Sequence, residues 1–270
     1  MDIQNWKQLS LLERNEYLTL LIRPLGKGLF TVDESSLTSD YPRISQAIGE
    51  VVLNYRVIFH HQTGLGLSDD CYNRLLKINP QPSITLSEMK PFIKMEVNLF
   101  AVAEHPILEV EAYKIIGKPF SSNNTPAFFD YSGAVNFLNT IGARFLSEVE
   151  WEAGVKQGED ILFPFGNSLP DAGELDLWLS FDSQSFMKKA TGNGLSGLFF
   201  GEWCGDLFKN SHHKNAEIKI GEYVIKGGGA YFWPWQADEW VWCLCAMRMP
   251  SGDLVDGTAV LRPALSLSFD

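Results

Sequence analysis

The chain has 270 residues, of which 45% are hydrophobic, and its formal net charge is −11 with a pI near 4.9. This length and apolar share allow one large domain, or one domain with an appendage, around a substantial core. The acidic balance argues against nucleic acid or an anionic membrane surface as the main partner, because both require a basic face. No apolar run approaches the ~20 residues of a membrane-spanning helix. The N-terminal segment has no signal-peptide core or cleavage site, so we expect a cytoplasmic protein.

Four cysteines are too few for a disulfide framework: Cys71, Cys204, Cys243 and Cys245. They form neither a Cys-x-x-Cys motif nor a Cys/His spacing that would hold a metal. We therefore predict reduced thiols that act mainly as small apolar side chains.

Residues 1–85 are predicted to form a mostly helical N-terminal appendage. Residues 15–25 are leucine-rich with helical spacing, and Pro24 and Gly26 end that pattern. Apolar residues three and four apart predict a second helix over 44–59, and 71–78 resembles a third. The Pro- and Asn-rich residues 79–83 mark a turn, so we place a boundary there and a second domain at 86–270.

The first part of the second domain mixes strands and helices. Residues 92–102 alternate loosely and predict a strand, and 108–116 predict a strand that continues into a helix. A further helix is expected to open at Tyr131 with Ser132 as its N-cap, and to end at Gly142.

A short helix carrying Trp151 is predicted by Ser147 and Glu150, which have the spacing of a capping box. Glu148, Glu150 and Glu152 lie on this helix, and we interpret them as capping and solvent-exposed groups rather than catalytic ones. Strands are expected over 223–225 and 260–267.

Residues 226–248 are the most unusual stretch. Three glycines precede a run of aromatic residues that contains four of the chain's eight tryptophans. Because Gln236, Asp238 and Glu239 interrupt this run, one strand face cannot bury all of it, and the composition favours a recognition surface. The alternative is a core strand with a bulge.

Six motifs in collinear order resemble the formylglycine-generating enzyme family over roughly residues 90–270. They are Arg144–Glu152 (RLPTEAEWE in the family), Phe163–Gly166 (YPWG), Gly194–Asp206 (GLYDMxGNVWEWCxD), Val224–Gly228 (VxRGG), Cys245–Arg248 (CAAR) and Leu261–Ala264 (GFRxA). The resemblance implies an irregular α+β domain of C-type lectin topology, in which the domain's two ends pair as strands and the loops carry function.

The same comparison shows departures from the family's chemistry. The family's oxidase binds copper through two cysteines five apart, but residues 230–242 contain no cysteine, and Cys243 lies only two residues from Cys245. We therefore expect no enzymatic activity and no cofactor. The Asn of the family's calcium-holding GNVWEW segment is also missing, so a calcium ion would depend on Glu202, Asp206 and main-chain oxygens.

The layout is most similar to the variable proteins of diversity-generating retroelements, which vary surface residues between the glycine turn and the last strand. We thus predict a non-catalytic ligand-binding module, with a protein as the expected ligand and a carbohydrate stacked on Trp as an alternative. Two other functions stay open: a structural subunit that docks through residues 1–85, and a divergent oxidase-like enzyme. The predicted ligand-binding residues are Tyr231, Phe232, Trp233, Trp235, Gln236, Asp238, Glu239, Trp240, Trp242 and Asp253.

Overall fold

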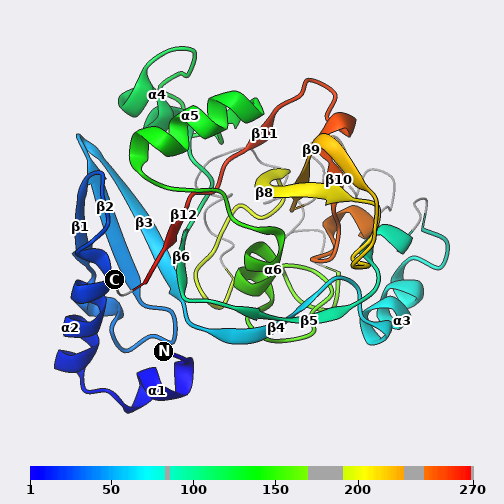
Figure 1. The fold of residues 1–270 in the computed structure, drawn as a ribbon, viewed down its shortest axis with the longest axis horizontal. Coiled ribbons are helices and arrows are strands. Elements are labelled where there is room, and N and C mark those ends of the chain that lie inside the picture. The colour runs from blue at the N-terminus through cyan, green and yellow to red at the C-terminus, as the bar shows by residue number, and fades with distance from the viewer. Residues whose placement is uncertain (83–85, 170–190, 228–239, 269–270) are drawn as a thin grey trace.

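The computed structural model describes residues 1–82, 86–169, 191–227 and 240–268 (Figure 1). Its α-helices are α1 (Ile3–Gln8), α2 (Leu11–Ile22), α3 (Asp69–Ile78), α4 (Glu109–Ile116), α5 (Tyr131–Ile141) and α6 (Glu148–Lys156). The strands are β1 (Leu29–Val32), β2 (Arg43–Ile48), β3 (Val51–Ile58), β4 (His61–Leu65), β5 (Ile93–Val97), β6 (Phe100–Ala103), β7 (Phe128–Phe129), β8 (Glu202–Lys209), β9 (Ile218–Lys226), β10 (Met249–Pro250), β11 (Ala259–Val260) and β12 (Ala264–Ser266). Short 3-10 helices are η1 (Glu34–Ser36), η2 (Leu86–Met89), η4 (Trp240–Cys243) and η5 (Ser251–Asp253).

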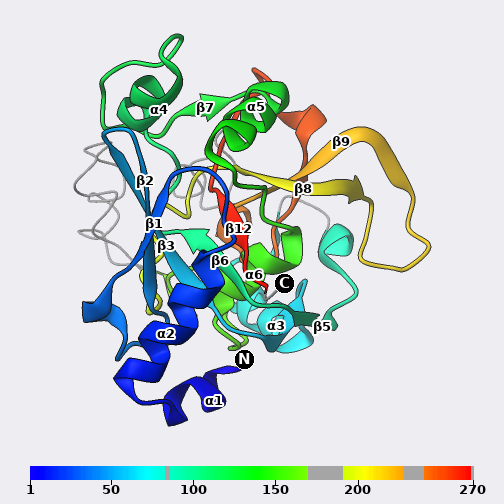
Figure 2. The same cartoon turned by 60° about the vertical axis from the view of Figure 1, so that its left-hand side comes forward.

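Two five-stranded sheets organise these elements, with strand orders β1-β2-β3-β6-β12 and β10-β9-β8-β11-β7, and β4 pairs separately with β5. In the first sheet β12, close to the C-terminus, pairs antiparallel with β6. Strands near the two ends of the predicted domain 86–270 therefore pair, as the resemblance implies. In the second sheet β8 and β9 reach out as a long hairpin (Figure 2).

The helix predicted over 44–59 is wrong, because these residues form β2 and β3. The two strands pair from Arg43↔Arg56 to Ile48↔Val51, which leaves a two-residue turn at Gly49 and Glu50. Gly49 takes a left-handed conformation (φ 58°), as such a turn requires. Alternate side chains of β2 and β3 are buried, which is the two-residue period of a strand. The β-branched residues of this stretch favour strands, although some of its apolar residues are also three and four apart.

The N-terminal residues also contain helices that the sequence predicts. Helix α2 begins at Leu11, earlier than expected, because Ser10 and Glu13 form a capping box. Helix α3 ends at Ile78, as predicted. The division of the chain into two domains at residue 85 stays a prediction. Strand β3, before this boundary, pairs with β6, after it.

Between 92 and 142 the elements differ in detail from the sequence-based expectation. Residues 92–102 give two strands, β5 and β6, and 108–116 give helix α4 alone. The N-cap of α5 is Asp130 rather than Ser132, because the Asp130 carboxylate accepts the Gly133 N–H at 2.6 Å. Gly142 ends α5 in a left-handed conformation, as predicted. The last expected strand, 260–267, is divided into β11 and β12.

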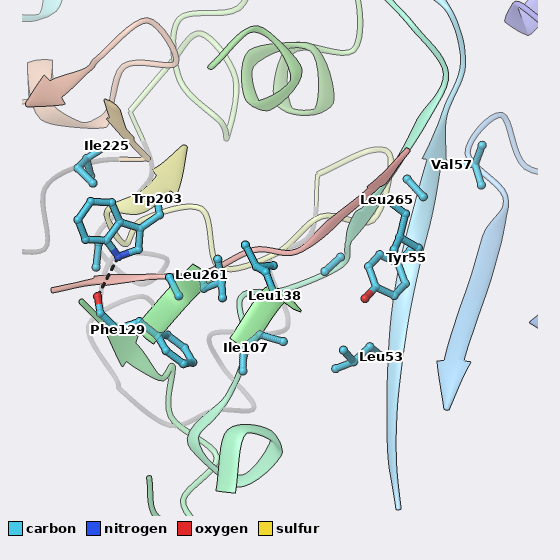
Figure 3. Close-up of a cluster of buried hydrophobic side chains, with 14 of the residues drawn as sticks. Leu53, Tyr55, Val57, Ile107, Phe129, Leu138, Trp203, Ile225, Leu261 and Leu265 are labelled. Atoms are coloured by element: carbon cyan, nitrogen blue, oxygen red, sulfur yellow. Dashed lines mark hydrogen bonds between the residues drawn. The ribbon is translucent and has the colours of Figure 1, made fainter. Parts of the chain in front are cut away.

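The core lies between the two sheets (Figure 3). Leu53 and Tyr55 of β3 form one side of the cluster shown, and Trp203 of β8 with Ile225 of β9 forms the other. The Trp203 indole donates to the Phe129 carbonyl at 2.8 Å, which satisfies its buried N–H. Among the described helices, none has the length and apolar character needed to span a bilayer.

Candidate functional site

Most of the predicted ligand-binding residues lie outside the described residues. Trp240 begins η4, and Trp242 of the same 3-10 helix is half-buried and packs against the core. Asp253 is exposed at the end of η5. The other predicted residues stay predictions: Tyr231, Phe232, Trp233, Trp235, Gln236, Asp238 and Glu239.

The two ends of the 227–248 segment are held side by side. Ile225 of β9 pairs with Met249 of β10, so the chain leaves and re-enters one sheet at adjacent positions. Gly227 has φ of 94°, and a Cβ at this position would lie 2.7 Å from the Phe200 carbonyl oxygen. Only glycine fits there, because both the backbone angle and the space exclude a side chain.

Helix α6 supplies the acidic side of a buried ion-pair network at these ends; it lies near the middle of the molecule, close to β8 (Figure 1). The exposure predicted for Glu148 and Glu152 is wrong, because the two residues are 6% and 0% exposed. Glu150 alone makes the predicted capping box, with Ser147. The spacing of four residues places Glu148 and Glu152 on the inner face of the helix.

Glu152 holds the end of β9 through Lys226. The Lys226 Nζ lies 2.7 Å from one Glu152 oxygen, and the Lys156 Nζ lies 2.6 Å from the other. The Gly66 N–H also donates to Glu152, at 3.0 Å. Burial alone would raise the pKa of Glu152, but Lys156 and Lys226 outweigh it and leave the pKa below its ordinary value. The carboxylate is therefore ionised and fully paired.

Glu148 holds the start of β10 through Arg248 in the same way. The Arg248 Nε lies 2.9 Å from Glu148 Oε1, and Nη2 donates to Oε2 at 3.0 Å. Burial opposes ionisation of Glu148, but contacts with His212, Lys226 and Arg248 lower its pKa from 4.5 to about 2. The two acids of α6 thus fix both ends of the 227–248 segment.

A second buried pair ties β8 to the chain before β12. Arg262 donates to Glu202 at 2.7 and 2.9 Å, and the Trp151 indole donates to the same carboxylate at 2.9 Å. All three residues are at most 2% exposed. The Asp206 carboxylate accepts the Glu148 N–H at 2.6 Å. The Glu202 carboxylate is therefore fully used by the protein and does not fit the calcium site considered above. Within the described ranges no group of three or more His, Cys, Asp or Glu could hold a metal ion.

The two cysteines within the 227–248 segment are enclosed. Cys243 is 5% exposed and Cys245 is 0% exposed. Burial raises the pKa of the Cys243 thiol well above its usual range and that of Cys245 to about 12. Both are therefore neutral thiols rather than the thiolates that bind metals and react.

A cavity of about 360 Å³ lies at the base of the segment. It is lined by the end of α6, the 161–166 turn and residues 191–199. Leu198 on its wall approaches Gly227, and the Cys245 N–H donates to the Leu162 carbonyl at 2.9 Å. Gly227 therefore approaches a lining residue of the cavity, and Cys245 is bonded to Leu162, the neighbour of the lining residue Ile161. Phe165 and Phe199 contribute aromatic rings, whose centroids lie 6.0 Å apart.

Sequence reasoning missed the buried network, although a signal was present. Lys226, Arg248 and Arg262 are each a single cation in an apolar stretch, and Glu202 is a single acid in another. A lone charge in an apolar run favours a buried ion pair, because a charge rarely enters a core without a partner.

No family model matches the chain, and no curated protein matches it. The solved structures that are similar in fold include the following two. Variable protein 1 of Treponema denticola is 15% identical with a TM-score of 0.55, and the match covers 82% of this chain and 98% of that one. PvdO of Pseudomonas aeruginosa is 16% identical with a TM-score of 0.56, and the match covers 79% and 94%.

Both neighbours have C-type lectin-like folds, so this chain has an α+β fold of that kind, as predicted. Identities this low show the fold alone. Membership of the formylglycine-generating enzyme family stays a prediction.

Proposed function

We propose that this chain is a non-catalytic ligand-binding protein whose recognition surface is formed by side chains from within residues 228–257. The single observation that carries the proposal is the buried network that holds the chain at Lys226, just before this range, and at Arg248 within it: Glu152 pairs with Lys226 and Glu148 pairs with Arg248. A fixed base lowers the entropy that a loop loses on binding, so this arrangement suits recognition.

The state of the cysteines supports a binding role over oxidase chemistry. Copper binding and oxygen activation by cysteine need thiolates that a metal can reach. Cys243 and Cys245 are buried neutral thiols, and neither lies in an open cleft. Copper uptake with oxygen consumption by the purified protein would favour the oxidase-like alternative.

A protein is the partner that composition favours. The segment combines aromatic residues with Asp238 and Glu239, and the whole chain is acidic. Aromatic anchors surrounded by acids suit a protein surface with a basic patch. The alternative ligand is a carbohydrate that stacks on the Trp rings, and a binding screen with proteins and carbohydrates would distinguish the two. We also propose that the protein is cytoplasmic. Its four free cysteines support this, because the reducing cytoplasm keeps thiols unpaired.

We extend the proposal to the variable protein of a diversity-generating retroelement. The fold similarity to variable protein 1 of Treponema denticola supports this. Sister copies that differ only within residues 230–260, beside a reverse-transcriptase gene with a template repeat, are the expected genomic finding. Identical segments in all copies would contradict it.

The direct test exchanges residues 228–257 with those of a sister sequence and keeps Lys226 outside the graft. The expected result is that partner specificity follows the grafted segment. A matched control changes Leu11 and Leu12 to Glu, on the exposed surface of α2, and should leave binding unchanged. If specificity stays with the recipient chain, the proposal fails.

An interaction subunit is the second candidate, and one observation favours it. Several apolar side chains of the N-terminal residues are exposed, from 47% to 68%: Leu11, Leu12, Leu20, Leu29 and Val52. Leu29 and Val52 both register with Ala47, so they lie in one row across β1, β2 and β3. A face of this kind suits docking to a larger assembly, and co-purification that is lost on changing Leu29 and Val52 to Ser would support this function.

A further inference from the structure

The cavity lined by the end of α6, the 161–166 turn and residues 191–199 has two polar side chains, the half-buried Gln157 and the exposed Glu159, that have no partner among the described residues. The Glu159 carboxylate and the Gln157 side-chain amide line it, and neither forms a side-chain hydrogen bond or an ion pair. Other polar groups of the wall are already used. Lys156 Nζ contacts Glu152 and donates to the carbonyls of Gly64 and Gly66. The cavity therefore offers a negative charge and an unused amide oxygen.

Gln157 is held in an unusual backbone conformation. It ends α6 with φ of 56°, and it is the one residue other than glycine with positive φ in the part of the chain that the structure describes. Glycine is the usual residue at such a helix end, since it takes this angle without strain. The Gln157 side chain is half-buried, and with the described residues it makes no hydrogen bond that would compensate. Strain of this kind is typical of sites that bind something.

The same cavity has an aromatic wall. The Phe163 and Phe165 rings stack 4.8 Å apart at 15°, and Phe165 and Phe199 lie 6.0 Å apart at 26°. Phe165 and Phe199 are half-buried and line the cavity. Aromatic rings attract cations, and the C-terminal end of a helix such as α6 carries partial negative charge. The cavity therefore favours a cation with an apolar body.

We propose that this cavity receives an arginine side chain of the partner protein. A guanidinium is planar, so it can lie against the aromatic wall while its N–H groups donate to the Glu159 carboxylate and the Gln157 amide oxygen. An ammonium lacks the flat shape and the fork of donors. The inference rests on the proposed function, because it takes the ligand to be a protein, and it names the side chain that the protein inserts.

The experiment uses two small probes on the full chain. N-acetyl-arginine-N-methylamide carries the guanidinium, and N-acetyl-citrulline-N-methylamide has nearly the same shape without the charge. Backbone N–H resonances of Gln157, Phe165 and Phe199 are followed by NMR during each titration. The arginine probe is expected to bind with a Kd on the order of 1–10 mM, which is the range of a single small fragment. The citrulline probe should bind at least about five-fold more weakly.

Variants locate the interaction. Glu159→Gln should weaken the arginine probe about three- to five-fold and leave the citrulline probe unchanged. Glu50→Gln is the matched control, since Glu50 is an exposed acid at the β2–β3 turn. Glu50 is far from the cavity. Arg56 of the same hairpin lies close to it, because its Nε approaches Gly194. Glu50 is six residues from Arg56, a distance of roughly 20 Å along a strand. This control should not change binding of either probe.

Three results would overturn the inference: no shift at the cavity residues, equal affinity for the two probes, or equal effects of Glu159→Gln and Glu50→Gln. These outcomes are separate from those of the segment exchange. If the arginine probe binds as expected while partner specificity ignores residues 228–257, the proposed function fails and the arginine site stands. If specificity follows the segment but the probe does not bind, only the arginine inference fails.

Discussion

Replacing Lys226 by methionine tests the buried network under the recognition surface. Methionine keeps the unbranched apolar body of lysine and removes the charge. Lys226 is 1% exposed, and its Nζ lies 2.7 Å from Glu152, which is 0% exposed. The substitution therefore leaves one oxygen of a buried carboxylate without its cation.

The expected loss follows from what Glu152 retains. Removing one partner of a buried ion pair costs about 3–5 kcal/mol. Glu152 keeps Lys156 at 2.6 Å and the Gly66 N–H at 3.0 Å, so we expect the lower end, about 3 kcal/mol. For a chain of this size about 3 kcal/mol corresponds to a decrease in Tm of roughly 6–12 °C.

Thermal unfolding followed by circular dichroism measures this effect. The matched control is Lys219→Met, a change of the same chemistry on the same strand β9. The Lys219 side chain is 38% exposed and lies 3.9 Å from Glu222, so its loss should cost less than about 0.5 kcal/mol. If the Tm of Lys226→Met lies within about 1 °C of that of the unchanged protein, the conclusion that the buried network fixes the segment is refuted.

Four further predictions follow from the same contacts. The pKa of Glu148 is about 2 in the folded chain against an ordinary 4.5, so the stability that it contributes is complete above pH 4.5 and is lost as pH falls toward 2. Glu148→Gln should therefore flatten the dependence of the free energy of unfolding on pH between about 4.5 and 2, and an unchanged slope would contradict it. Gly227→Ala should destabilise the chain by about 2 kcal/mol or more in urea unfolding, because the new Cβ meets the Phe200 carbonyl oxygen, whereas Gly26→Ala, with no atom within 4 Å, should cost far less. Cys243 and Cys245 should react with a thiol reagent such as DTNB only after denaturation, since burial keeps both neutral and enclosed; rapid reaction of the folded chain would argue for an accessible thiolate. Gln157→Gly should raise the free energy of unfolding by about 0.5–1 kcal/mol while it weakens the arginine probe, and a destabilised variant would show that the side chain has a structural role instead.

Local signals in the sequence predicted local structure well. The capping box of Ser147 with Glu150 and the glycine after α5 both act over a few residues, and both are present. The helix predicted over 44–59 is wrong because its apolar residues satisfy two periods at once. The feature that distinguishes two strands from one helix here is the two-residue turn at Gly49 and Glu50. This turn requires the left-handed backbone angle that Gly49 adopts.

The ion-pair network could not be read from local rules. A carboxylate near a helix start is usually a capping or solvent-exposed group, and Glu150 follows that rule. Glu148 and Glu152 do not, because their partners Arg248 and Lys226 are 100 and 74 residues away in the sequence. The collinear family motifs contain all four residues, but a motif does not show which members face each other. For the same reason the cavity at Gln157 and Glu159 was not predicted.

The recognition surface itself is tested most directly by a hydrogen-exchange footprint of the chain with its captured partner. Partner binding is expected to slow amide exchange in residues 228–257 and in the cavity wall at 157–166 and 191–199. Exchange in residues 11–58 should stay as in the free chain. Protection confined to residues 11–58, with 228–257 unchanged, would contradict a recognition role for this segment and favour docking through the N-terminal residues.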